Sequence, residues 1–125
     1  MSWAVSVKGL IGWGGEVVLL RNERNEWELP GGQPDATDPT PEAALGRELD
    51  EELGLDAQVG PLLSAYRYDP VPHRPVLILV YRCWADRPAA LWHSDEHGAV
   101  GLFGPSAIDS ITLPDGYRKA IELFT

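Results

Sequence analysis

The segment from Thr40 to Gly54 constrains the fold most, because its two ends and its periodicity all specify one amphipathic helix. Thr40 followed by Pro41 is a typical helix start, with a hydroxyl that can cap and a proline at the first helical position. Gly54 can adopt the left-handed conformation that ends many helices. At roughly 100° per residue, one stripe of the segment carries only leucines, at positions 45, 49 and 53. The sequence therefore predicts a helix over Thr40 to Leu53 that buries this stripe.

The adjoining stripe of the same helix carries three carboxylates, those of Glu48, Glu51 and Glu52. Between residues 35 and 56 there are eight acidic residues and one basic residue, Arg47, so this segment holds most of the chain's net charge of −9. Like charges repel one another unless they are solvated or bound to cations. The pattern leaves two interpretations open, a solvated helix face or a site for a divalent metal such as Mg²⁺, which prefers oxygen ligands.

The rest of the chain alternates between strand-like and loop-like segments. Residues 5–11 and 16–21 predict two strands that form a hairpin around the turn Gly14-Gly15. Residues 76–84 are apolar and β-branched, which predicts a central strand buried on both faces. Further predicted elements are an extended piece at 27–29, a strand within 58–68, loops at 69–75 and 86–98, a short strand at 99–103 and a helix at 114–124.

Length and charge exclude several classes of protein. The 125 residues suffice for one domain, so we expect a single domain over residues 1–125. The net charge of −9 argues against nucleic acid or an anionic membrane as the main partner. The longest apolar run, 76–81, is far shorter than the ~20 residues of a membrane helix. A single cysteine, Cys83, and no visible signal peptide predict a cytoplasmic protein without an internal disulfide.

Residues 47–55, Arg-Glu-Leu-Asp-Glu-Glu-Leu-Gly-Leu, resemble the C-terminal half of the Nudix box, R-E-U-x-E-E-x-G-U, at every defined position. Residues 27–32, Trp-Glu-Leu-Pro-Gly-Gly, are similar to the segment that leads into that box. By this resemblance the chain is identified as a member of the Nudix family. The resemblance implies an α/β (α+β) Nudix fold, with a mixed β-sheet sandwiched between helices, and a single Nudix hydrolase domain over residues 1–125.

The resemblance also implies an activity and a cofactor. Nudix hydrolases cleave a diphosphate bond in a nucleoside diphosphate linked to another moiety, such as a nucleoside triphosphate, ADP-ribose or a nucleotide sugar, with Mg²⁺ or, alternatively, Mn²⁺. The partner would be a small nucleotide, bound by a monomer or a homodimer.

The family's site residues can be carried over position by position. Glu51 and Glu52 would be metal ligands, and Glu48 would be either a ligand or the base that activates water. Arg47 would orient a carboxylate through a bidentate pair. The carbonyl of Gly31 or Gly32 would complete the metal's shell.

Two features lie outside this match. The loop before the helix is one residue longer than the family pattern, and Asp38 is the expected stand-in for the usual upstream glutamate. Family members often recruit another acid from a later loop, and Glu96 is the candidate, with Asp95 as the alternative. Further side chains could touch phosphate or stack on a base, although a plain surface or core role is the default for each; they are His73, His93, His97, Trp3, Trp13, Tyr66 and Tyr68.

Three interpretations therefore compete. The first is a Nudix hydrolase, the second is a catalytically silent Nudix-fold nucleotide-binding or sensor module, and the third is an unrelated acidic domain with a solvated helix. The presence of Glu48, Glu51 and Glu52 favours the hydrolase over the silent module. The match over residues 27–55 disfavours the third interpretation.

Overall fold

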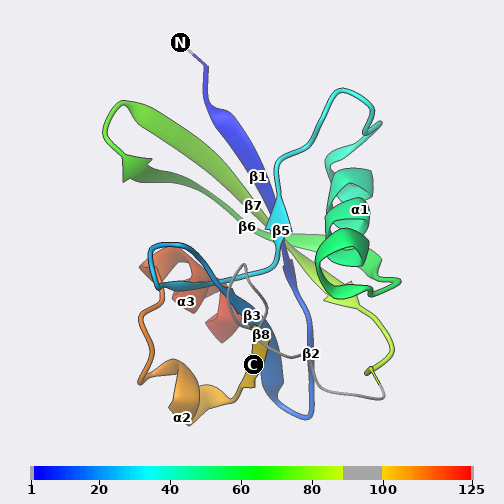
Figure 1. Cartoon of the computed structure of the whole chain (residues 1–125), viewed down its shortest axis with the longest axis vertical. Helices are drawn as coiled ribbons and strands as arrows, with labels where there is room; N and C mark the ends of the chain where they lie inside the picture. The colour runs from blue at the N-terminus through cyan, green and yellow to red at the C-terminus, as the bar shows by residue number, and fades with distance from the viewer. Residues whose placement is uncertain (1, 89–99, 125) are drawn as a thin grey trace.

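Two four-stranded sheets form the framework of the computed structural model, which describes residues 2–88 and 100–124 (Figure 1). Sheet A has the strand order β5-β1-β7-β6. Its strands β1 and β7 are parallel, while β1 with β5 and β6 with β7 are antiparallel, so the sheet is mixed. Their bounds are β1 (Ala4–Leu10), β5 (Gly31–Gly32), β6 (Gln58–Val71) and β7 (Arg74–Trp84).

Sheet B is built around β3 (Glu16–Arg21) and is antiparallel throughout. One edge of β3 pairs with β2 (Gly12–Trp13) and β4 (Trp27–Glu28), and β8 (Val100–Phe103) pairs with its other edge. The predicted hairpin of 5–11 with 16–21 is therefore wrong in its first arm. Strand β1 pairs in parallel with β7 of sheet A and does not pair with β3. The chain leaves sheet A after Leu10, and only the short β2 forms the hairpin with β3.

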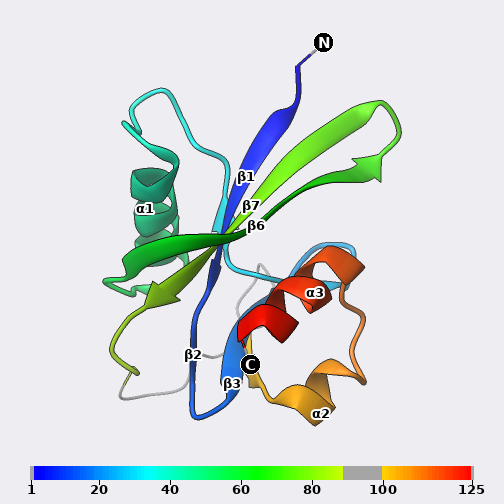
Figure 2. The same ribbon diagram turned by 180° about the vertical axis from the view of Figure 1, so that it is seen from behind.

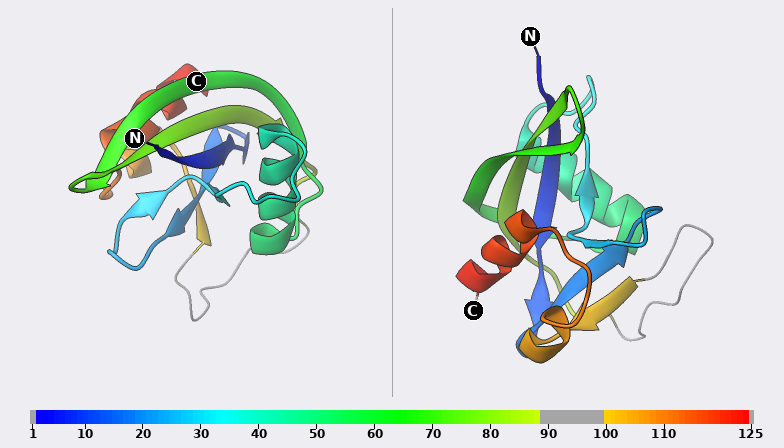
Figure 3. Two further views of the ribbon diagram at one scale, coloured as in Figure 1. Left: turned by 90° about the horizontal axis from the view of Figure 1, so that it is seen from above. Right: turned by 90° about the vertical axis from the view of Figure 1, so that its left-hand side faces the viewer.

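Helices α1 (Pro41–Leu53) and α3 (Asp115–Phe124) cover opposite faces of sheet A (Figures 2 and 3). Alternation along the strands sends successive side chains to opposite faces. Thus Tyr81 of β7 packs in the core cluster of α1, and its neighbour Val80 packs in the cluster of α3. The prediction of a mixed sheet between helices is confirmed.

Both predicted ends of α1 are confirmed in detail. The side chain of Thr40 accepts a hydrogen bond from the N–H of Ala43 at 3.0 Å, and Pro41 occupies the first turn. Gly54 has φ 66° and its N–H donates to the carbonyl of Asp50 at 2.8 Å. The leucine stripe is buried as expected, and full burial of one such side chain stabilises the fold by about 1.5–3 kcal/mol.

The β6–β7 hairpin is longer than the sequence predicts. The expected loop at 69–75 shrinks to a turn at Pro72-His73, because β6 continues to Val71 and β7 begins at Arg74. Pro70 does not break the ladder, since β6 lies at the edge of sheet A and carries a register shift between Tyr68 and Val71. His73 adopts φ 65° in this turn, which permits the tight reversal.

The C-terminal part agrees with prediction apart from one addition. Strand β8 covers residues 100–103 of the predicted strand, whose first residue lies outside the described ones, and helix α3 begins one residue after its predicted start. The short helix α2 (Pro105–Ile108) was not predicted. The predicted loop 86–98 is described only as far as residue 88. Among the described residues, no helix is long and apolar enough to cross a membrane.

The two glycines Gly31 and Gly46 provide a matched stability test. Gly31 has φ 145°, and a Cβ added there would lie 1.9 Å from the carbonyl oxygen of Val7. Gly31→Ala should therefore lower the free energy of unfolding by about 3 kcal/mol or more. Gly46 lies in α1 with no atom within 4 Å of an added Cβ, so Gly46→Ala should raise it by about 0.5–1 kcal/mol. Urea unfolding followed by circular dichroism measures both, and equal effects would contradict the described path of β5.

Candidate metal and catalytic site

The site begins where β5 packs against the C-terminal half of α1. The N–H of Gly31 donates to Oε1 of Glu52 at 2.9 Å. The carboxylate of Glu48, one turn earlier on the helix, lies against Gly32, where an added Cβ would stand 2.6 Å from the carboxyl carbon. Only glycine leaves room for this approach. The two carboxylates are thus held beside one short stretch of backbone.

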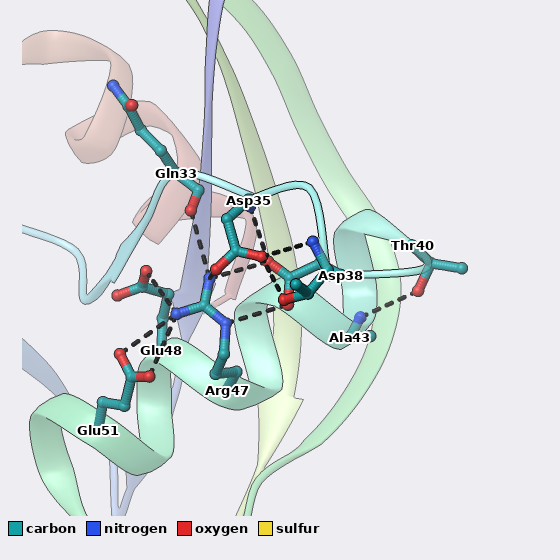
Figure 4. A network of polar contacts seen from close by, with 9 residues as sticks. Gln33, Asp35, Asp38, Thr40, Ala43, Arg47, Glu48 and Glu51 are labelled. Atoms are coloured by element: carbon teal, nitrogen blue, oxygen red, sulfur yellow. Dashed lines mark hydrogen bonds and ion pairs between the residues drawn. The ribbon is translucent and has the colours of Figure 1, made fainter.

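Arg47 fixes the loop before α1 to the helix (Figure 4). Its Nε donates to Oδ1 of Asp38 at 3.0 Å and its Nη2 donates to Oδ2 at 2.8 Å. Such bidentate pairs between a guanidinium and a carboxylate are geometrically specific. The side chain of Asp38 is only 6% exposed. The bidentate pair predicted for Arg47 is present, with Asp38 as its partner, and the role of Asp38 as stand-in for the upstream glutamate stays a prediction.

The other arm of Arg47 reaches the helix acids. Its Nη1 donates to Glu48 at 3.2 Å and to Glu51 at 3.2 Å (Figure 4). Its Nη2 lies 3.6 Å from Asp35 and also donates to the carbonyl of Gln33. One cation therefore offsets much of the repulsion that the acidic stretch would otherwise suffer.

These contacts shift the pKa values of the carboxyl groups in opposite directions. The hydrogen bond from Arg47, assisted by the backbone N–H of Asp35, lowers the pKa of Asp38 to about 2. Hydrogen bonds from Thr37 lower the pKa of Asp35. Glu52 keeps contact with solvent, but the protein atoms around it remove part of its hydration and raise its pKa to about 7. The N–H of Gly31 and the charge of Lys8 oppose this rise.

The acids of α1 do not form a ready-made cluster for a divalent cation in the described residues. In the described part of the chain, no three His, Cys, Asp or Glu side chains are arranged to hold an ion. The contacts explain this, since Arg47 attracts Glu48 and Glu51 while the Gly31 amide holds Glu52. The oxygens available are nevertheless of the kind that Mg²⁺ takes. Glu48 and Glu52 supply oxygens of this kind beside Gly31-Gly32, Glu51 would have to turn from Arg47 to join them, and the ligand set remains a prediction.

The other predicted residues lie apart from this cluster or outside the described residues. Glu96, Asp95, His93 and His97 fall in the segment 89–99, which is not described. His73 occupies the β6–β7 turn. Trp3 stacks under the guanidinium of Arg67, 5.1 Å from the ring centre, and Nε1 of Trp13 donates to the carbonyl of Ala85 at 2.9 Å. Both tryptophans thus already have protein partners.

One charged residue near the site was not predicted as part of it. Lys8 lies in β1, directly opposite Gly31 of β5, and it is only 6% exposed. A lysine within a strand of otherwise apolar and small residues is the sequence signal that could have identified it, because lysine is almost never fully buried without a partner.

Both the sequence and the fold of the chain match known proteins. The profile of the NUDIX domain family matches residues 2–124. A MutT-like protein of Streptomyces ambofaciens is 35% identical over 82 residues, which cover 64% of this chain but only 51% of that protein. The match therefore spans about half of that relative's length.

Two solved structures cover nearly the whole chain. The MutT protein of Methanosarcina mazei Go1 is 27% identical with a TM-score of 0.78, over 98% of this chain and 92% of that one. The MutT NUDIX hydrolase of Burkholderia pseudomallei is also 27% identical, with a TM-score of 0.75 over 100% of both chains.

The pair of Asp38 with Arg47 predicts how stability depends on pH. Because folding lowers the pKa of Asp38 from 3.8 to about 2, ionised Asp38 stabilises the fold above its unfolded pKa, and this stabilisation is lost as the pH falls through the folded value. Asp38→Asn should therefore lower the Tm at neutral pH, and the gap to wild type should close between about pH 4 and about pH 2. Thermal unfolding across this range measures the gap.

Asp109→Asn is the matched control for this experiment. The side chain of Asp109 is 84% exposed and lies 3.7 Å from Arg118, so its replacement should change the Tm little at any pH. A Tm gap for Asp38→Asn that stays constant down to about pH 2 would contradict the described pair.

Proposed function

Since the chain belongs to the Nudix family, we propose that it is a hydrolase that cleaves a diphosphate bond in a small nucleotide, with Mg²⁺ or Mn²⁺ as cofactor. The substrate class is a nucleoside diphosphate linked to another moiety. Residues 1–125 would act as a single Nudix domain. The observation that carries the proposal is the placement of Glu48 and Glu52 against the backbone of Gly31-Gly32.

Glu48, Glu51 and Glu52 would hold the divalent ion, with a carbonyl of Gly31 or Gly32. The bound ion would supply charge stabilisation at the phosphoryl oxygens and lower the pKa of a water. Glu48 is either a ligand or the base that takes the proton of the attacking water. The water oxygen would bond to phosphorus while the bridging P–O bond breaks and the leaving phosphate keeps the electron pair. Arg47 would act indirectly, by fixing the carboxylates through its contacts with Asp38, Glu48 and Glu51.

A second candidate function is a nucleotide-binding or sensor module without catalysis. One observation favours it: Glu48 and Glu51 are both bound by Arg47. In that case the acids would balance Arg47 and hold the loop, and they would not hold an ion. Activity of the wild type on any nucleotide decides between the two candidates.

The free thiol of Cys83 and the net charge of the chain bear on where the protein works. Cys83 is a buried free cysteine, and burial raises its pKa to about 11, which leaves it unreactive in a reducing cytoplasm. The net charge of −9 disfavours nucleic acid and anionic membranes as partners. We propose a cytoplasmic enzyme, with the choice between monomer and homodimer open.

Glu52→Gln tests the enzymatic assignment. The change keeps the volume and the hydrogen bond from Gly31 but removes one charge that would hold the cation. Charge builds on the phosphoryl oxygens as the reaction proceeds, so kcat should fall more than substrate affinity, by about 100-fold or more. Steady-state hydrolysis across nucleoside triphosphates, ADP-ribose, nucleotide sugars and dinucleoside polyphosphates provides the measurement.

Glu42→Gln is the control, because Glu42 is an exposed acid in the first turn of the same helix. It should leave kcat unchanged. If Glu52→Gln turns over as fast as wild type while circular dichroism shows both folded, the metal assignment is wrong.

Metal binding can be measured without any substrate. The clustered carboxylates should bind Mg²⁺ or Mn²⁺ only in the folded state, which raises the Tm by mass action. Millimolar Mg²⁺ should therefore raise the Tm relative to EDTA in wild type, and the double variant Glu48→Gln/Glu52→Gln should lose this shift. Equal Tm values for wild type with EDTA and with Mg²⁺ would contradict a site that binds its ion before the substrate.

A further inference from the structure

Among the described residues, Lys8 is the one charged residue that is buried, with 6% of its surface exposed. Its strand, β1, is flanked by the α1 cluster on one face and the α3 cluster on the other. The ammonium lies on the α3 side, 5.9 Å from the centre of the Tyr117 ring. Taking an ammonium out of water is costly unless it is paired, so its presence here requires a partner.

The partner in the structure satisfies Lys8 only weakly. Glu28 Oε1 is the one carboxylate oxygen within ion-pair distance of Lys8 Nζ among the described residues, and the distance is 3.9 Å. That distance exceeds the 2.7–2.9 Å that is typical of a charge-assisted hydrogen bond. The other oxygen of Glu28 accepts from Nδ2 of Asn22 at 3.2 Å. An ammonium has three donors, so Lys8 keeps the capacity to bind a second anion.

The position of Lys8 puts that capacity beside the candidate metal site. Its backbone pairs with Gly31 of β5, and the N–H of the next residue, Gly9, donates to the carbonyl of Pro30 at 2.9 Å. The N–H of Gly31 in turn holds Glu52. The backbone of Lys8 is therefore one strand away from the glycines that contact the carboxylates of α1, on a strand in the interior of sheet A.

The surroundings of Lys8 strengthen a charge contact. Tyr117 is buried, and it belongs with partly buried Tyr66 and Tyr68 to the cluster between α3 and sheet A. Tyr66 packs tightly on α3, where a Cβ at Gly116 would stand 2.3 Å from its ring. Packed aromatic side chains lower the local dielectric, so the Lys8 ammonium would interact with an anion more strongly there than in water.

We propose that Lys8 is a substrate-binding residue whose ammonium exchanges its weak pair with Glu28 for a phosphoryl oxygen of the substrate. This inference rests on the proposed function, because it assigns part of the diphosphate to Lys8 and part to the metal carboxylates. Glu28 then competes with the substrate for Lys8. The competing explanation is a structural ion pair that only ties β1 to β4.

Binding of inorganic pyrophosphate in EDTA, measured by calorimetry, separates these explanations without metal or turnover. Lys8→Met keeps the length and removes the charge, and it should weaken pyrophosphate binding by about 10- to 100-fold, the range expected when one charged hydrogen bond is lost. Glu28→Gln frees the ammonium from its competitor and should tighten binding. This second variant keeps the test valid if Lys8→Met does not fold.

Lys119→Met is the matched control, since Lys119 is the chain's other lysine, is exposed on α3, and gives the same change in net charge. It should leave pyrophosphate affinity unchanged. Failure of wild type to bind pyrophosphate at millimolar concentration, or equal affinity of wild type and Lys8→Met, would overturn the proposal. So would a Glu28→Gln variant that only lowers the Tm without tightening binding, because a structural pair predicts that result.

The outcome is independent of the proposed hydrolysis. If Lys8 binds pyrophosphate but neither turnover nor a metal-dependent Tm shift is found, the proposed enzyme activity fails and the Lys8 assignment stands. If Glu52→Gln lowers turnover but Lys8→Met leaves pyrophosphate affinity unchanged, the Lys8 assignment fails and the proposed enzyme activity stands.

Discussion

The guanidinium of Arg47 faces four carboxylates that come from two different segments of the chain, Asp35 and Asp38 from the loop and Glu48 and Glu51 from α1. Five N–H donors in a fixed plane suit this task, and a lysine could not replace them. The two hydrogen bonds to Asp38, at 3.0 and 2.8 Å, are the shortest that Arg47 makes. Its Nη1 restrains the acids of the helix through bonds to Glu48 and Glu51. Without this cation, the acidic loop and the acidic helix face would repel each other, and the position of β5 beside α1 would be less defined.

The second constraint is the pair of glycines in β5. Gly31 adopts a φ that side chains rarely take, and Gly32 admits the carboxylate of Glu48. Strand β1 fixes both glycines by backbone pairing, in which Lys8 lies directly opposite Gly31. The backbone of Lys8 and the backbone that contacts the α1 carboxylates are thus neighbours in sheet A. This arrangement suits a ligand that carries both phosphate and a divalent ion, which is the chemistry proposed for the chain.

Features determined by local sequence could be predicted well. The caps and leucine stripe of α1 follow from neighbouring residues, and the partnership of Arg47 with a carboxylate follows from the family pattern. Features determined by distant pairing could not. The split of residues 5–21 between two sheets depends on the parallel match of β1 with β7, which lies about seventy positions along the chain. The proposed role of Lys8 likewise depends on register, since it follows from the pairing of Lys8 with Gly31, whose N–H contacts Glu52.

We propose that the acids of α1 and the glycines of β5 form the site of a divalent cation. The most direct test is a crystal structure of the protein soaked in Mn²⁺, with the ion located by its anomalous scattering. We expect an anomalous peak bound by Glu48 and Glu52 beside Gly31-Gly32, with Glu51 turned away from Arg47 or contacting the ion through water. A peak elsewhere, or none at a Mn²⁺ concentration that raises the Tm, would contradict it.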